Sequence, residues 1–460
     1  MIHGSQATRS TFRRIVAWAT GGMCTFAIGV QAQEIGTLAT FDLSFGGQYT
    51  VGDGSDADES LLTTDLGFTL QSITRAQSFS LSADGRLQFD EDGGGIENPG
   101  LAADYTRANE TTALSLGVSY SLDEVDGEMD ILDPLTQSVI NFIDDDGTLE
   151  TVTATAGLQT GLDARFGTDT QFSYSSRRYS GTSDPDLTDS DILQASMALR
   201  FDVSPAISLE VTANHVRREE SGGTNESRET SRAGIGAEIL LDPLWTATVD
   251  LQYSDISTEV DDGFGGRLIS GQTGTGFTLT VNREFRTGTL GVSVSRQIAA
   301  NGAEDSVRVS RTMELANDGV LSWSLGLVSF SNGDTSPIAS FAYAVPTRRG
   351  NFAVNLQQMT ALNEGDQSVI STVAGLSYNL STTEISRWSL TGDLTRVDVV
   401  GSDTEDQQRL EVGVSYSHAL TRDWDLSAGV SHRVNYAGGD QDSSASTLSI
   451  ALGRSFSLRP

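Results

Sequence analysis

The strongest constraint on the fold is a strict alternation of apolar and small polar residues near the C-terminal end of the chain. The apolar positions of the stretch 409–420 are Leu410, Val412, Val414 and Tyr416, and the positions between them are Glu411, Gly413, Ser415 and Ser417. The same alternation returns at 424–436 and at 448–456. A period of two residues is typical of β-strands, because successive side chains point to opposite faces. Each stretch is therefore predicted to be a strand with one apolar face and one small, polar face.

This pattern continues back through the chain to residue 41, so the prediction is an all-β protein of one domain. We predict strands near residues 41–51, 62–70, 79–89, 101–109, 112–122, 150–162, 170–181, 190–203, 207–219, 230–241, 245–257, 270–283, 288–299, 306–316, 320–331, 337–345, 350–360, 367–380, 385–399, 409–420, 424–436 and 448–456. The total is about 22, within a range of about 18 to 24, since strand boundaries are hard to place from sequence. Short turns alternate with longer acidic connections such as 219–229, 259–270 and 401–408.

Composition decides what the apolar faces contact. Only 37% of residues are hydrophobic and the mean hydropathy is −0.20, so no stretch after the first thirty or so residues predicts an apolar membrane helix. Alternating strands cross a bilayer without such a stretch, with the apolar face toward lipid and the polar face toward a wet lumen. We therefore predict a transmembrane antiparallel β-barrel.

Aromatic residues support the same interpretation. Trp245, Trp323, Trp388 and Trp424 come near the starts of strands that leave the short-turn side, and several tyrosines, among them Tyr179, fall near the opposite rim. Two aromatic belts are typical of the two interfaces of a bilayer.

As a class, the pattern resembles Gram-negative outer-membrane β-barrels over residues 37–456. This resemblance implies an outer-membrane location, contact with lipid and lipopolysaccharide, and folding by the barrel-assembly machinery. One departure is the C-terminal end, where Phe456 is followed by four further residues instead of closing the chain.

The N-terminal segment differs from the rest. Three arginines precede a run of apolar or small residues, and Val30-Gln31-Ala32 fits a small-residue cleavage site. Residues 1–32 are predicted to be a cleaved signal peptide, which leaves 33–460 as the barrel. The single cysteine, Cys24, lies within that signal, so no disulfide is expected in the mature barrel.

The longest predicted connection, 123–148, is too apolar for an ordinary solvated loop, with Ile131, Val139 and Ile140 among its residues. Two alternatives follow. The segment folds over or into the barrel mouth as a constriction, or it packs against neighbouring loops.

Function is predicted from the lumen. Only about eight residues separate Gln33 from Phe41, too few for a plug domain, so we predict a barrel without a plug. The leading hypothesis is an aqueous pore for passive diffusion of small hydrophilic solutes or ions. The alternatives are the outer-membrane conduit of an export system, for polysaccharide or protein, and a structural or surface-interaction barrel. A net charge of −33 argues against a nucleic-acid partner, and a homo-oligomer is possible.

We predict no catalytic, cofactor-binding or metal site, and no cofactor. His418 and His432 fall on the lipid-facing side, where a membrane hydrolase would place histidine beside serine, but their positions along neighbouring strands differ. Arg296 and Arg311 also fall on the outward side, where they snorkel to an interface or mark a bulge. Acidic clusters at 144–146 and 184–191 lack the spacing of a calcium loop.

Overall fold

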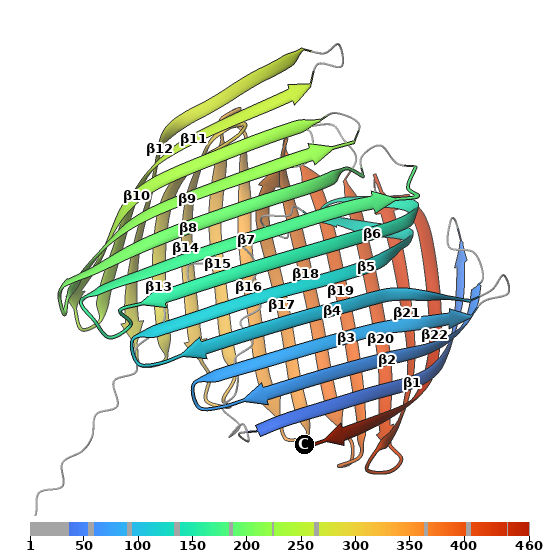
Figure 1. Ribbon diagram of the computed structural model, residues 1–460. Helices are drawn as coiled ribbons and strands as arrows, with labels where there is room; N and C mark the ends of the chain where they lie inside the picture. Colours follow the sequence, from blue (N-terminus) through green and yellow to red (C-terminus); the bar gives the residue numbers. More distant parts are fainter. Residues whose placement is uncertain are drawn as a thin grey trace, which may run out of the picture.

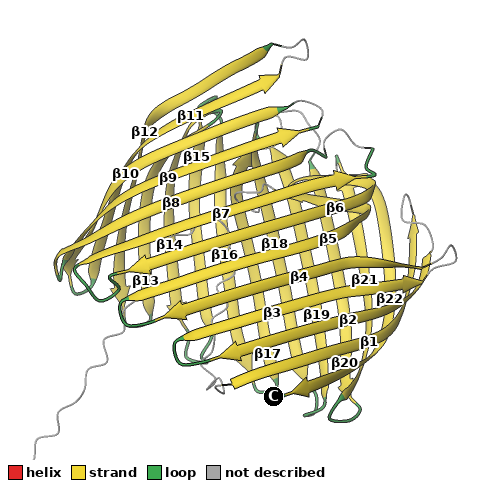
Figure 2. Ribbon diagram, in the orientation of Figure 1, coloured by secondary structure: helices red, strands yellow, loops and turns green. Residues whose placement is uncertain are grey.

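The fold is one continuous sheet of 22 strands, seen in Figures 1 and 2. The computed structural model describes residues 36–53, 59–89, 94–132, 139–183, 187–222, 225–261, 266–362, 367–401, 406–438 and 440–459. The strands are β1 (Gly36–Asp53), β2 (Glu59–Ile73), β3 (Gln77–Phe89), β4 (Gly94–Ala108), β5 (Thr112–Leu132), β6 (Val139–Thr160), β7 (Phe166–Ser180), β8 (Asp189–Ser204), β9 (Ile207–Ser221), β10 (Glu226–Asp242), β11 (Trp245–Asp261), β12 (Arg267–Phe285), β13 (Gly288–Ala299), β14 (Gly302–Glu314), β15 (Val320–Phe330), β16 (Thr335–Thr347), β17 (Gly350–Leu362), β18 (Ser368–Ser381), β19 (Ser386–Val399), β20 (Gln407–Ala419), β21 (Trp424–Ala437) and β22 (Asp440–Leu458).

The sheet closes on itself. Each strand pairs antiparallel with the next one along the chain, and β1 pairs with both β2 and β22. The seam between β1 and β22 runs from Ala39 opposite Leu458 to Asp53 opposite Ser444. Closure leaves no free edge along this seam, and it confirms the predicted antiparallel barrel of about 22 strands. The predicted signal peptide lies outside the described residues and stays a prediction.

The apolar faces point outward and the polar faces point into the barrel. Outward side chains are widely exposed, with Phe45 at 50% and Ile450 at 57%. A water-soluble protein rarely leaves so continuous an apolar surface uncovered. The outer wall is therefore suited to lipid, and the lumen wall is built from the alternating small and polar residues.

The strands are longer than predicted at the loop end, where odd-numbered strands end. The segments 219–229 and 259–270 were expected to be acidic loops, but β9 pairs with β10, and β11 with β12, through most of them. Antiparallel pairing satisfies the backbone groups of these hairpins beyond the predicted boundaries. The outer part of β12, from Arg267 to the residue before Phe277, pairs with β11 and not with β13. The loop ends of β11 and β12 therefore rise above the wall beside them (Figure 1).

Aromatic rings form cross-strand pairs at the turn end of the barrel. Trp388 contacts Tyr416 with ring centroids 4.8 Å apart, and Phe166 contacts Phe201 at 5.0 Å. This agrees with the predicted belt on that side. At the opposite rim Tyr179 differs from the prediction, because it packs inside the mouth and not on the outer belt.

The described residues include no helix long and apolar enough to cross a membrane.

Candidate functional site at the barrel mouth and lumen

The β5–β6 hairpin is the main feature of the mouth. β5 continues to Leu132 and β6 begins at Val139, with the pairs from Glu124 opposite Thr148 to Leu132 opposite Val139 extending the ladder. The prediction of a loop over 123–148 is therefore wrong for most of its length. Among its residues with described side chains, Ile131, Val139 and Ile140 are buried.

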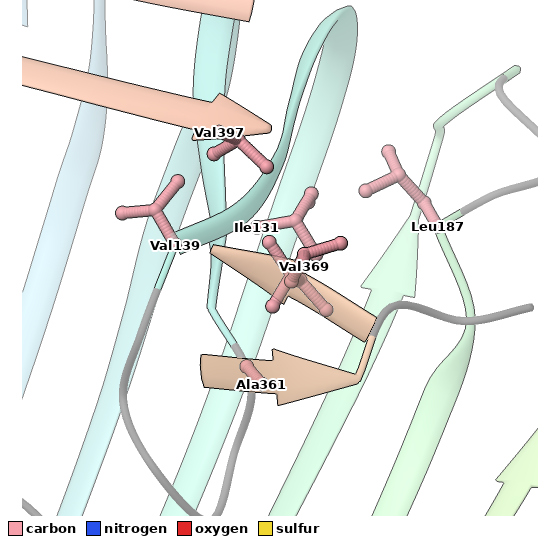
Figure 3. Packing of buried hydrophobic residues seen from close by; sticks show 7 residues of the cluster. Ile131, Val139, Leu187, Ala361, Val369 and Val397 are labelled. Atoms are coloured by element: carbon pink, nitrogen blue, oxygen red, sulfur yellow. The ribbon is translucent and has the colours of Figure 1, made fainter. Parts of the chain in front are cut away.

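The tip of this hairpin packs against distant strands. Figure 3 shows Ile131 and Val139 beside Val369 and Val397, with Ala361 close by. The buried members of this mouth cluster are Ile131, Val139, Ile140, Leu187, Ala361, Val369 and Val397, and Phe142, Tyr179 and Val399 pack around them. Each large apolar side chain buried in this way contributes about 1.5–3 kcal/mol.

The contact crosses the mouth instead of following the wall. β6 contacts β18 and β19, although neither strand is its neighbour in the wall. In one direction around the ring, β7 to β17 lie between β6 and β18. In the other direction, β1 to β5 and β20 to β22 lie between β6 and β19. In a closed barrel, strands so far apart meet only across the opening. The structure thus supports the inward-folding alternative for this segment.

Apolar residues on the inward side of β17 to β19 receive the hairpin. Val369 and Val397 occupy positions that the alternation assigns to the lumen, and Val369 is fully buried. An apolar residue on the wet face of a barrel strand conflicts with the lumen pattern. The two valines at lumen positions were the feature of the sequence that could have indicated a docking surface at the mouth, and sequence reasoning missed them.

Polar contacts hold the hairpin on a further strand. The backbone N–H of Phe142 donates a hydrogen bond to Oε1 of Gln407 in β20, at 3.1 Å. The guanidinium of Arg409 lies over the Phe142 ring, 4.8 Å from its centroid. A cation above an aromatic face adds about 0.5–2 kcal/mol. Together with the mouth cluster, these contacts anchor the hairpin as a lid across the opening.

Below the mouth, carboxylates line the lumen wall of β7 to β11. Glu210 lies opposite Arg200 on one side and Gly236 on the other, and Gly236 lies opposite Asp250. Asp169 and Glu238 lie close enough to Glu210 for their charges to act on it. A methyl group on Gly236 would come within 2.4 Å of Oδ1 of Asp250, so glycine leaves room for that carboxylate. We call Asp169, Glu210, Glu238 and Asp250 the acidic wall.

The three histidines of the described chain each face a serine on the neighbouring strand. Nδ1 of His418 lies 2.8 Å from Oγ of Ser386, and Nδ1 of His432 lies 2.9 Å from Oγ of Ser446. His215 makes the same contact with Ser231 at 3.0 Å. Sequence reasoning missed these partners because cross-strand register was not known.

The pairs have a structural explanation. Ser386 is buried, and the described residues place the Tyr416 hydroxyl, not a carboxylate, beside His418. A hydrolase needs an accessible nucleophile and a base oriented by a third group. Cross-strand hydrogen bonding accounts for the pairs, and the prediction of no catalytic site stays a prediction.

The described aspartates of the predicted acidic cluster at 184–191 also have protein partners. Asp191 pairs with Arg178 and accepts a hydrogen bond from the Tyr174 hydroxyl at 2.8 Å. Asp189 accepts one from the backbone N–H of Tyr179 at 2.8 Å. The side chains at 144–146 and the residues 184–186 lie outside the described part of the chain. Within that part, no group of three or more His, Cys, Asp or Glu is placed to hold a metal ion.

Comparison with known proteins decides the class. A family model described as the outer membrane protein beta-barrel domain matches residues 99–285. This chain is an outer-membrane β-barrel protein. No curated protein sequence matches this outer-membrane barrel.

Solved structures match the outer-membrane barrel over nearly its whole length. The open form of the ferric-catecholate import receptor Fiu from E. coli K12 has a TM-score of 0.60, 11% identity, and coverage of 91% of this chain and 81% of its own. The siderophore receptor PiuA from Acinetobacter baumannii has 0.57 and 10%, with 90% and 82% covered. A mutant of the ferric enterobactin receptor PfeA from Pseudomonas aeruginosa has 0.55 and 12%, with 92% and 80% covered. At such low identity the likeness shows the fold.

These neighbours correct the prediction that the barrel has no plug. They are receptors with a plug domain, and outer-membrane transporter barrels of 22 strands have a plugged lumen in general. The prediction rested on the short distance between Gln33 and Phe41, which concerns only one stretch of chain. A small, polar inward face is found in open and in plugged barrels alike, so it does not decide between them.

The same neighbours correct the predicted function. Passive diffusion of small solutes does not match import receptors, and neither an export conduit nor a structural barrel matches them. The coarser predictions of an outer-membrane location and a part in transport are confirmed. The neighbours are receptors and not enzymes, and small-ligand binding is consistent with them. Contacts with lipopolysaccharide and the assembly machinery, and a homo-oligomer, stay predictions.

Proposed function

We propose that this outer-membrane barrel is an import receptor that binds a ligand at its mouth and carries it inward by an energy-dependent step. The observation that carries the proposal is the β5–β6 hairpin, which crosses the mouth of a 22-stranded barrel and packs on β17 to β19. A lid anchored by a buried apolar cluster suits ligand-controlled entry better than free diffusion. The similarity to Fiu, PfeA and PiuA supports the same proposal.

The acidic wall indicates the charge of the ligand. The four carboxylates of the acidic wall lie near one arginine, Arg200, which also forms an ion pair with Asp202, so an anionic ligand meets repulsion at this place on the lumen wall. Nearer the mouth on the same face, Arg218 and Arg228 are paired with Glu220 and Glu226. Fiu is named for ferric catecholates, which are strongly anionic, and PfeA is named for ferric enterobactin. Ferric hydroxamates are neutral or cationic, and the acidic wall favours them. We therefore propose a neutral or cationic iron chelate as the ligand class.

Uptake of radioactive iron tests the import step. Cells that produce the full chain are expected to accumulate iron from a ferric hydroxamate, and a protonophore should abolish this uptake. Cells without the chain provide the control. Equal uptake in both kinds of cell, or uptake that the protonophore leaves unchanged, would overturn the proposal.

Charge variants test the ligand class. In the double variant Glu210→Gln/Asp250→Asn, binding of a cationic ferric hydroxamate to the purified protein should weaken by about fivefold for each charge removed, from about 1 kcal/mol each. Binding of a ferric catecholate should strengthen. Asp104→Asn, on β4 and outside the acidic wall, serves as the matched control. A catecholate preference in the unaltered protein would contradict the proposed ligand charge.

A further inference from the structure

Arginines on the outer surface of the barrel differ between its two ends. At the loop end, outward arginines pair with carboxylates. The pairs include Arg178–Asp191, Arg217–Glu219, Arg267–Glu259, Arg296–Asp305 and Arg396–Asp398. At the turn end, Arg283, Arg311 and Arg454 also point outward, and within the described ranges no carboxylate forms an ion pair with them.

Two of the turn-end arginines belong to one row across five strands. The row runs Trp245, Arg283, Leu290, Arg311, Trp323 on β11 to β15, each residue directly opposite the next. All five occupy outward positions. The tryptophans at both ends mark the depth of the bilayer interface. Both guanidinium groups therefore lie at the level of lipid headgroups.

Aromatic rings support the two arginines without neutralising them. Cζ of Arg283 lies 4.8 Å from the centroid of Phe285 and 5.3 Å from that of Trp245. Cζ of Arg311 lies 4.3 Å from the same Phe285 ring. Two like charges beside one ring repel each other unless an anion lies between them. In addition, Nη1 of Arg311 is shielded from solvent and has no hydrogen-bond partner in the described structure.

The same arrangement recurs on the far side of the ring. Arg454 lies opposite Trp424 and Leu43, with Cζ 5.2 Å from the Trp424 ring and 4.3 Å from Phe456. Both places share an Arg-x-Phe sequence near the end of an even-numbered strand and a tryptophan at the start of the preceding strand. Two independent occurrences argue for a built feature instead of an isolated unpaired charge.

We propose that these two clusters bind the phosphate of anionic phospholipids in the periplasmic leaflet. Short turns mark the periplasmic side of bacterial outer-membrane barrels, so the turn end faces that leaflet. Guanidinium groups bind phosphate oxygens in a planar, bidentate geometry. The phosphate supplies the counterion that aspartate and glutamate supply at the loop end. The lipid tail lies along the apolar outer wall beside Leu290 or Leu43.

Native mass spectrometry of the full chain in neutral detergent tests this, with phosphatidylglycerol and phosphatidylcholine as probes. We expect selective retention of phosphatidylglycerol at two sites. Arg283→Gln/Arg311→Gln should weaken one site by at least about tenfold, and Arg454→Gln should weaken the other, since charged hydrogen bonds are lost. Arg283→Lys/Arg311→Lys should keep part of the binding, because charge remains. Arg296→Gln, at the loop end, is the matched control and should change neither site.

Three results would overturn the proposal. These are equal retention of the two lipids, unchanged retention by the glutamine variants, and complete displacement of the lipid by millimolar inorganic phosphate. The last result would show a free-anion site. Altered mobility of the heated and unheated protein on gels checks that each variant forms the barrel, so loss of lipid is not confused with loss of fold.

Discussion

Val369 fits a β-strand but does not fit the polar lumen face of a barrel. The alternation along β18 places its side chain on the inward face, where it is fully buried beneath the β5–β6 hairpin. A valine at a lumen position would normally face water. Its burial therefore depends on a partner from elsewhere in the chain.

Val369→Ala should loosen the lid and leave the barrel intact. Removing two buried methyl groups costs about 1–3 kcal/mol. Hydrogen exchange of the amides in 139–150 should therefore accelerate by about tenfold or more. Val412→Ala makes the same change on the lipid-facing side of β20 and should leave that exchange unchanged. Equal exchange in the two variants would show that the mouth cluster does not hold the hairpin.

Gly288, at the start of β13, shows a backbone requirement. Its φ is 132°, and a Cβ there would lie 2.0 Å from the carbonyl oxygen of Thr312. Because that atom belongs to the backbone, Gly288→Ala should destabilise the barrel by about 1–3 kcal/mol or more. Gly392→Ala, where a Cβ meets nothing within 4 Å, is the control. Urea unfolding in micelles compares the two, and equal midpoints would contradict the argument.

At the scale of elements, the hairpin is separable from the wall. The pairs of β5 with β6 from Val125 opposite Gly147 to the tip lie beyond the ladder of β5 with β4, which ends at Ser121. They also lie beyond the ladder of β6 with β7, which begins at Thr148. Neighbouring strands therefore keep their ladders when the tip is removed.

Replacing 126–146 by Asn-Gly should leave a folded barrel with an open mouth, since this turn joins two directly opposed residues. A cysteine introduced in the lumen, Asn355→Cys, should then react faster with a bulky maleimide added from outside. The single native cysteine, Cys24, lies in the predicted signal. Replacing 261–267 in the β11–β12 hairpin is the control. Equal labelling in both deletions would show that the β5–β6 hairpin does not cover the lumen.

At the scale of the whole molecule, closure depends on the last residues of β22. Leu458 pairs with Ala39 and Arg454 with Leu43, and the rings of Phe41 and Phe456 lie 6.3 Å apart across this seam. These contacts join the two ends of the chain. They explain how the barrel closes although four residues follow Phe456.

Truncation after Gly453 should prevent closure, because β1 then has an unpaired edge at the turn end. Truncation after Leu458 removes residues that follow the last seam pair and should have little effect. The fraction of protein with heat-dependent mobility on gels measures closure. A folded fraction after Gly453 truncation equal to that of the full chain would show that the seam does not need these pairs.

Much of the fold could be read from the sequence alone. Alternation in stretches such as 409–420 predicted strands, because a period of two is a local property of an extended backbone. The apolar side of that alternation also predicted which face meets lipid, and the tryptophans predicted the interface. These conclusions need no knowledge of which strands are neighbours.

The tertiary structure decided everything that depends on distant neighbours. The burial of Val369, the serine partner of each histidine and the row from Trp245 to Trp323 arise from register and ring closure. Residues 123–148 could be recognised as unusually apolar, but their docking surface on β17 to β19 lies more than two hundred residues away. The prediction of an unplugged lumen rested on the stretch between Gln33 and Phe41, and the polar inward face could not correct it, because such a face is compatible with both an open and a plugged barrel.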